Sequence, residues 1–279
     1  MTNGWVLGLL VALALAGGAR AETTCGGPLA YQDAATQNAT SLDILAWAPF
    51  GRPEVGWEIY APRIAAEIGT GCAPATPGFA YALARWKASH GIAGEAFDAA
   101  TFDAMKAEWQ AARPFVAIRK AGACPEAPDL TELVAAAPEE SDGGKILLLR
   151  PDALAAYRRM VAAARAEVPE AAADPERLML FSAFRSPADD AARCEAEANC
   201  NGLVRATCSS HRTGEAIDLF LGSAPGFDVD SADDANRLWM SRTQTYRWLV
   251  ANARRYGFVN YVFEPWHWEW VGPISPSPD

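Results

Sequence analysis

Hydrophobic residues recur three or four positions apart in two stretches of the first half of the chain, which predicts two helices. The first helix ends near His90 and Gly91, and the second begins at Asp98, with a short loop over residues 92–97 between them. We expect each helix to bury one face, through Phe79, Leu83 and Trp86 in the first helix and Phe102, Met105 and Trp109 in the second.

Short apolar runs in the second half of the chain predict strands. Residues 145–150 and 178–184 are two such runs, and an amphipathic helix from Pro151 or Asp152 to about Val168 separates them. Because further strands follow this strand, helix and strand, we expect an α+β fold. It comprises a small, largely antiparallel sheet with flanking helices, preceded by a small, mainly helical domain.

Two later apolar runs carry charged or titratable side chains. Residues 216–221 are apolar except for Asp218, whose burial as an anion is costly unless a cation meets it. Residues 266–271 alternate, so that three tryptophans lie on one face of the strand and His267 with Glu269 on the other. Asp218 therefore calls for a cationic partner, which a metal ion would supply.

The chain divides into three segments. A short apolar stretch that ends in an A-x-A sequence predicts a cleaved secretory signal over residues 1–21; the lack of Lys and Arg before it leaves an uncleaved anchor or a buried N-terminal helix as alternatives. A Pro- and Gly-containing stretch separates an N-terminal domain, residues 22–123, from a C-terminal domain, residues 124–279. We therefore expect a secreted or periplasmic protein with no stable membrane insertion after signal cleavage.

Cysteine usage agrees with export, because six cysteines are an even number suited to an oxidising compartment. The sequence does not determine how they pair. The cluster Cys194, Cys200 and Cys208 could instead form a thiolate zinc site, but it lacks a C-x-x-C pair, so we expect disulfides.

The charge balance is acidic, with 24 Lys and Arg against 34 Asp and Glu. A nucleic-acid-binding protein would have a positive balance and a basic patch, so nucleic acid is excluded as a partner. Because the net charge is negative, an anionic substrate would have to be held by a few arginines at the binding site and not by the overall electrostatic field of the protein.

Two of the three histidines lie in segments that also contain carboxylates. His211 precedes Asp218 by seven residues, and a turn at Gly214 would bring imidazole and carboxylate together. With His267, these side chains supply the two imidazoles and one carboxylate that bind zinc and leave its fourth position open, as in catalytic sites. We predict one zinc ion per chain. The alternative is an ordinary loop in which Arg212 pairs with Asp218.

Two carboxylates compete for the role of proton carrier beside this metal. Under strict strand alternation Glu264 would face away from His267, but Pro265 belongs at a sheet edge or bulge, which can turn Glu264 toward the same side. Glu269 shares the face of His267 without such an adjustment and is the competing candidate.

Three polar residues around His211 are expected to serve the loop. Ser209 and Thr213 are hydrogen-bonding residues and not nucleophiles, because no third histidine lies near them in sequence to activate them. Arg212 is expected to be a solvated charge, with a grip on a terminal carboxylate as the alternative.

The two histidine segments form an extended motif that reads Ser209-x-His211-x-x-Gly214-x-Ala216-x-Asp218, followed by Glu264-x-x-His267. This motif resembles that of the zinc D-alanyl-D-alanine carboxypeptidases of the VanY type. The segment Phe181-Ser182-Ala183-Phe184-Arg185-Ser186 is similar to the family's Ser-Gly-Tyr-Arg-Ser segment. The resemblance covers about residues 178–272. The short segment between Phe258 and Glu264 and the cysteines before His211 depart from the family.

The resemblance implies a role for each residue: His211, Asp218 and His267 would bind zinc, Glu264 would be the catalytic base, and Arg185 would steady the substrate carbonyl. It implies an exported zinc metallopeptidase that hydrolyses peptidoglycan stem peptides. The expected activity is that of a D,D-carboxypeptidase, which removes terminal D-alanine by zinc-activated water. A peptidoglycan endopeptidase with the same site and a non-catalytic cell-wall-binding protein are the alternatives.

A second resemblance lies in the N-terminal domain. The helix, loop and helix of residues 76–112 are similar to the small helical peptidoglycan-binding module found beside wall-cleaving enzymes. The Asp-Gly-x-Phe-Gly turn of that module is replaced here by Gly94-Glu95-Ala96-Phe97-Asp98. The alternative is that the aromatic residues form only the core of a helical pair.

Overall fold

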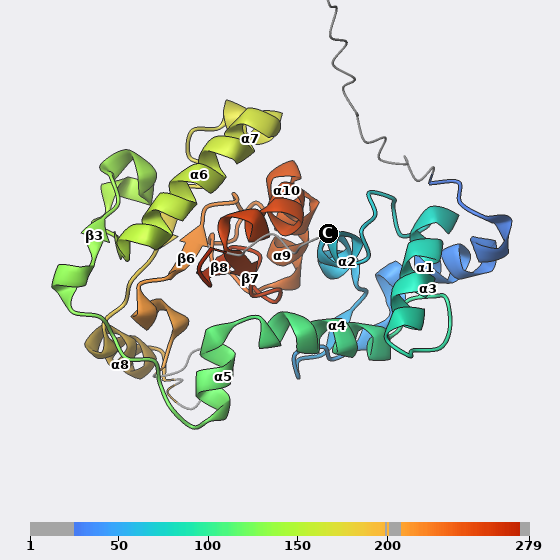
Figure 1. The fold of residues 1–279 in the computed structure, drawn as a ribbon, viewed down its shortest axis with the longest axis horizontal. Coiled ribbons are helices and arrows are strands. Elements are labelled where there is room, and N and C mark those ends of the chain that lie inside the picture. The colour runs from blue at the N-terminus through green and yellow to red at the C-terminus, as the bar shows by residue number, and fades with distance from the viewer. Residues whose placement is uncertain (1–24, 199, 201–207, 274–279) are drawn as a thin grey trace, which may run out of the picture.

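Helices from both halves of the chain surround one small antiparallel sheet (Figure 1). The computed structural model describes residues 25–198, 200 and 208–273. The expected secretory signal, residues 1–21, lies outside these ranges. Within them, no helix combines the length and the apolar character needed to cross a membrane.

The described α-helices are α1 (Gln32–Ile44), α2 (Ala61–Glu67), α3 (Pro77–Ser89), α4 (Ala99–Ala111), α5 (Pro114–Lys120), α6 (Pro151–Glu167), α7 (Pro169–Ala173), α8 (Pro187–Ala196), α9 (Asp234–Arg242) and α10 (Gln244–Asn252). The described strands are β1 (Ala46–Trp47), β2 (Glu54–Val55), β3 (Val134–Ala135), β4 (Leu148–Leu149), β5 (Leu180–Ser182), β6 (Ala216–Leu219), β7 (Phe258–Asn260) and β8 (His267–Trp270). The predicted α+β fold, with a helical region before a small antiparallel sheet, is confirmed.

The two helices predicted in the N-terminal region are α3 and α4. Thr76 caps the start of α3 and His90 is its C-cap residue, whereas Asp98 caps α4 by accepting a hydrogen bond from the N–H of Thr101 at 2.7 Å. All six apolar residues predicted for their inner faces are buried, in a cluster that includes Trp57. These residues form the core of the region, as a helical pair requires. Peptidoglycan binding by this region stays a prediction.

The central sheet has the strand order β5-β6-β8-β7, and neighbouring strands are antiparallel. The predicted amphipathic helix is α6, which buries its apolar face in the same core cluster as Ile217 and Trp268 of the sheet. The side chain of Tyr157 in α6 also donates a hydrogen bond to the carbonyl of Leu178 at 2.9 Å. The helix is therefore fixed to the segment that leads into β5.

The strand expected at residues 145–150 is shorter than predicted and lies outside the central sheet. Only Leu148–Leu149 form β4, which pairs with β3. Two glycines with positive φ precede this region, Ile146 is 83 % exposed, and Pro151 begins the next helix. Proline has no N–H to donate to a neighbouring strand, so the strand cannot extend past Arg150.

The N-terminal region packs directly on the C-terminal half of the chain. Helix α2 contacts α10, and the 3₁₀ turn Glu58–Tyr60 contacts α9 (Figure 1). Fully buried Arg237 of α9 contacts Glu54 Oε1 at 3.1 Å and Tyr60 Oη at 2.6 Å. Its Nε donates to the carbonyl oxygen of Phe263 at 2.8 Å. A buried ion pair thus joins the N-terminal region to the turn that precedes β8.

All six cysteines form disulfides, so the cluster near residue 200 is not a thiolate metal site. The pairs are Cys25–Cys72, Cys124–Cys208 and Cys194–Cys200. The second pair ties the segment after α5 to the loop that leads into His211.

Candidate functional site

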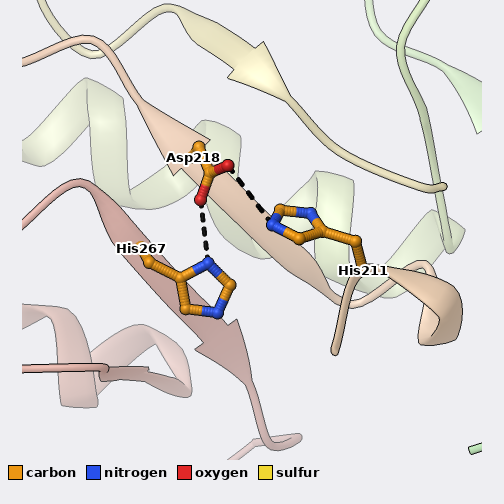
Figure 2. A group of neighbouring side chains, drawn as sticks. All are labelled: His211, Asp218 and His267. Carbon is orange, nitrogen blue, oxygen red and sulfur yellow. Dashed lines mark hydrogen bonds and ion pairs between the residues drawn. The ribbon is translucent and has the colours of Figure 1, made fainter. Parts of the chain in front are cut away.

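Asp218 and His267 face each other on adjacent strands. They are register partners in β6 and β8, so their side chains leave the sheet on the same face. The Nδ1 atom of His267 lies 2.8 Å from Asp218 Oδ1 (Figure 2). The next pair on this face is Ala216 and Glu269. The sheet register therefore brings together a carboxylate and an imidazole that are 49 residues apart in sequence.

His211 reaches the same carboxylate from the loop before β6. Residues Ser210–Thr213 form a short 3₁₀ helix that ends at Gly214, whose φ of +70° lies in the left-handed region favoured by glycine. A Cβ atom at this position would also lie 2.7 Å from the side chain of Leu133. The turn directs His211 back toward β6, and its Nε2 lies 3.2 Å from Asp218 Oδ2.

One ligand atom from each of His211, Asp218 and His267 lies within 4.8 Å of the other two, and all three residues are buried (Figure 2). His211 Nδ1 contacts the carbonyl of Ala183 at 2.8 Å, which requires a proton on Nδ1 and leaves the lone pair on Nε2. His267 Nε2 contacts Glu269 Oε1 at 3.2 Å, which leaves Nδ1 for the cluster. This donor set fits a catalytic zinc ion.

The charges in this cluster shift the pKa of each member. Burial by itself would raise the pKa of Asp218, but the two imidazoles beside it hold the pKa well below its usual range. Burial would lower the pKa of His267, but the carboxylates of Asp218 and Glu269 raise it to about 9. A divalent cation would take the place of the proton that His267 shares with these carboxylates.

Glu264 lies in the turn directly before β8. Its N–H donates to the carbonyl of Tyr261 at 2.8 Å, and its carbonyl accepts from the N–H of His267 at 3.0 Å. The chain therefore forms turns on both sides of Glu264, whereas the sequence predicts a sheet edge or a bulge at Pro265. The Glu264 side chain lines the same groove as the three clustered side chains. Burial is the main cause that raises the pKa of Glu264 to about 7, which suits a general base.

Glu269 has different partners. Its Oε1 accepts hydrogen bonds from Arg113 Nε at 3.0 Å and Nη2 at 2.6 Å, and both side chains are buried. Although burial raises the pKa of Glu269, His267 and Arg113 together lower it to about 2. A carboxylate held ionised in this way is a poor proton carrier near neutral pH, so Glu264 fits that role better than Glu269.

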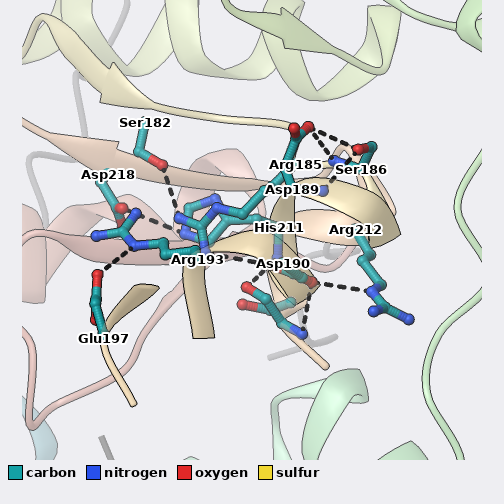
Figure 3. Close-up of polar contacts among 12 residues, drawn as sticks. Ser182, Arg185, Ser186, Asp189, Asp190, Arg193, Glu197, His211, Arg212 and Asp218 are labelled. Carbon is teal, nitrogen blue, oxygen red and sulfur yellow. Dashed lines mark hydrogen bonds and ion pairs between the residues drawn. The ribbon is translucent and has the colours of Figure 1, made fainter. Parts of the chain in front are cut away.

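Arg185 lines the groove beside His211, and the buried carboxylate of Asp190 holds it there (Figure 3). Arg185 Nη1 lies 3.3 Å from Asp190 Oδ1, and its backbone N–H donates to the carbonyl of His211 at 3.2 Å. Asp190 Oδ2 also accepts from Arg212 Nε at 2.9 Å and from the N–H of Ser209 at 3.2 Å. One carboxylate thus fixes both Arg185 and the loop that carries His211.

The loop residues around His211 only partly follow the sequence predictions. Ser209 and Thr213 serve the loop as expected: Ser209 Oγ accepts from the N–H of His211 at 3.2 Å, and Thr213 Oγ1 donates to the carbonyl of Ser210 at 2.8 Å. The expectation that Arg212 is a solvated charge is wrong, because Arg212 pairs with a carboxylate inside the protein.

Sequence reasoning missed three contributors to this site: Arg113, Asp190 and Ser210. Ser210 Oγ lies 3.0 Å from His267 Nε2. The sequence did contain a signal for Asp190. Asp189 completes the capping box of α8, so the neighbouring Asp190 in the same turn is not needed for capping and can accept from another partner. No local pattern marked Arg113, because its partner lies 156 residues away.

The three clustered residues His211, Asp218 and His267 line a groove of about 1250 Å³ together with Glu264 and Arg185. The N-terminal region contributes part of its wall, including Phe50, Arg52, Gln110, Arg113 and Arg119. The groove is large enough for a peptide substrate.

Comparison with known proteins assigns the second half of the chain. Residues 147–273 match the VanY family model, described as D-alanyl-D-alanine carboxypeptidase, whereas no curated protein matches the chain. The matched range contains the whole four-stranded sheet and the residues His211, Asp218, Glu264 and His267. The family predicted from the motif is confirmed: residues 147–273 form a peptidase domain of the VanY D-alanyl-D-alanine carboxypeptidase family.

Proposed function

We propose that this protein is an exported zinc metallopeptidase, a D,D-carboxypeptidase that removes the terminal D-alanine from peptidoglycan stem peptides. The proposal rests on the convergence of His211, Asp218 and His267 in one groove with Glu264, inside a VanY domain. The three disulfides support a place outside the cytoplasm.

The side chains of the groove can divide the chemistry among them. Zinc held by the two imidazoles and Asp218 would lower the pKa of a bound water toward neutrality and polarise the scissile carbonyl. Glu264, whose pKa is raised to about 7, accepts the proton of the attacking water and passes it to the leaving amine. Arg185, oriented by Asp190, donates to the carbonyl oxygen as negative charge develops there.

Cationic side chains in the groove suit a substrate that ends in a carboxylate. Arg119 and Lys120, at the end of α5, line the groove and are exposed. Within the described ranges of the chain, neither side chain forms an ion pair. Both are therefore available to a substrate anion, which favours the carboxypeptidase over an enzyme that cuts only internal bonds.

Mass spectrometry of defined muropeptides tests this function. We expect the zinc-loaded protein to remove one alanine from a monomeric pentapeptide stem and to leave a cross-linked dimer joined. Separation of the dimer into two stems would establish the endopeptidase instead. If the mass of neither substrate changes while both bind, the cell-wall-binding alternative replaces the enzyme.

Arg185→Met tests the role of the groove arginine. We expect kcat to fall by about 10²–10³-fold, because the loss of one donor to a developing oxyanion has an effect of this size. Zinc content should stay at the wild-type level. Arg158→Met is the matched control, since the exposed Arg158 pairs with Glu140 at 2.7 Å and neither residue lines the groove. Equal kcat values in both variants would remove Arg185 from the mechanism.

A further inference from the structure

Each of the three nitrogens of the Arg113 guanidinium donates a hydrogen bond. Its Nε and Nη2 donate to Glu269 Oε1, and its Nη1 donates to Gln110 Oε1 at 2.7 Å. The Cζ atom of the guanidinium lies over the ring of Tyr261, 4.2 Å from the ring centroid. Such a guanidinium cannot change position without breaking several contacts. It therefore offers Glu269 a fixed partner.

Glu269 passes this constraint to His267. The two residues lie on the same face of β8, and Glu269 Oε1 is the atom that contacts both Arg113 and His267 Nε2, the latter at 3.2 Å. A hydrogen bond on Nε2 fixes the tautomer of the ring and the direction in which Nδ1 points. His267 Nδ1 is the nitrogen that faces Asp218. The position of Arg113 thus helps to aim Nδ1, together with Ser210, whose Oγ lies 3.0 Å from the same Nε2.

Burial makes this chain of contacts costly to interrupt. The side chains of Arg113, Glu269 and His267 are each 5–6 % exposed. If the guanidinium is removed, a buried carboxylate loses its cation, and Glu269 must then move or seek another partner. Either change loosens the imidazole that it holds.

We propose that Arg113 is a positioning residue of the metal centre, which acts through Glu269 on the imidazole of His267. This inference rests on the proposed zinc site and extends it beyond the VanY domain, because Arg113 precedes residue 147. The N-terminal region is then a working part of the peptidase site in addition to anything it binds.

Zinc affinity of the full-length protein, measured by competition with a chelator, tests the proposal without any activity assay. We expect Arg113→Met to raise the zinc Kd by about 10–100-fold, as the loss of an outer partner of a metal-bound histidine does. Arg63→Met is the matched control. Arg63 is a partly buried arginine of the same region, which pairs with Glu67 at 3.0 Å and stacks on Trp109. Its variant should keep the wild-type Kd within about threefold.

A double variant distinguishes positioning from a general loss of stability. Glu269→Gln alone should also raise the zinc Kd by about 10–100-fold. If Arg113 acts through Glu269, adding Arg113→Met to Glu269→Gln changes the Kd by less than about threefold. An equal loss of affinity in both backgrounds would overturn the proposal, whatever happens to the unfolding temperature.

A second substitution covers the case in which Arg113→Met does not fold. Arg113→Gln keeps one donor but removes the charge and the paired donation, and we expect it to raise the Kd in the same direction. Zinc binding by wild type that neither Arg113 variant changes would overturn this inference alone. Wild type that binds no zinc would overturn the proposed function together with it.

Discussion

Glu264→Gln is expected to lower kcat on a pentapeptide stem by about 10²–10⁴-fold while leaving the zinc Kd within about threefold of wild type. Glutamine keeps the size and the polarity of the side chain but cannot accept the proton of the attacking water. Glu264 lines the groove without belonging to the cluster of three ligand atoms, so the metal should remain bound. Steady-state kinetics together with metal analysis on the same preparation measure both quantities.

Glu269→Gln is the matched control for this experiment, because the two carboxylates lie five residues apart on the same segment. We expect the opposite pattern for Glu269→Gln: weaker zinc binding, with most of the activity restored at saturating zinc. Glu269 is held by Arg113 and His267, so its loss affects how the metal is bound more than proton transfer. Reversed patterns in the two variants would exchange the assigned roles of Glu264 and Glu269.

Much of the site could be predicted because its parts follow from local patterns. The alternation of β8 placed His267 and Glu269 on one face, and the charge of Asp218 inside an apolar run indicated a cationic partner. The sheet register then aligned Asp218 with His267. Gly214 supplied the turn that returned His211 to them. Each of these steps depends on residues a few positions apart, where backbone geometry limits the possible arrangements.

The contributors that could not be predicted depend on contacts between distant segments. Arg113 meets Glu269 across 156 residues, and no spacing or propensity in either segment encodes that encounter. The pairing of β3 with β4 similarly depends on tertiary structure, because an apolar run of the same composition would suit the central sheet equally well. Both features follow from how the two halves pack.

Two arginines connect the packing of the N-terminal region with the geometry of the site. Arg237, held by Glu54 and Tyr60, fixes the carbonyl of Phe263 immediately before Glu264. Arg113 fixes Glu269, which lies two residues after His267 in β8. The N-terminal region therefore supports this segment at both ends, directly through Arg113 and indirectly through the two side chains that hold Arg237. A peptidase domain that lacked this region would retain its ligands but lose Arg113 and these two partners of Arg237.

His211→Ala is expected to raise the zinc Kd by more than about 100-fold, beyond the loss caused by an outer partner. His211 supplies one of the two imidazoles that leave a nitrogen directed at Asp218, and an alanine offers no ligand atom. Activity at stoichiometric zinc should fall at least as far as in Glu264→Gln. For wild type, zinc at about 100 times its Kd should stabilise the folded state by about 2.7 kcal/mol, whereas the same zinc concentration should stabilise His211→Ala by less than about 0.4 kcal/mol.

His90→Ala is the control that separates this role from the general loss of a histidine. His90 is the third histidine of the chain; it lies at the end of α3, where it stacks on Trp86 and pairs with Glu108 at 3.1 Å. Its variant should keep the zinc affinity and the zinc-dependent rise in unfolding temperature of wild type. If His211→Ala keeps both as well, His211 does not bind zinc, and its contact with Asp218 is then a structural ion pair, which would leave Asp218 and His267 to hold any metal without it.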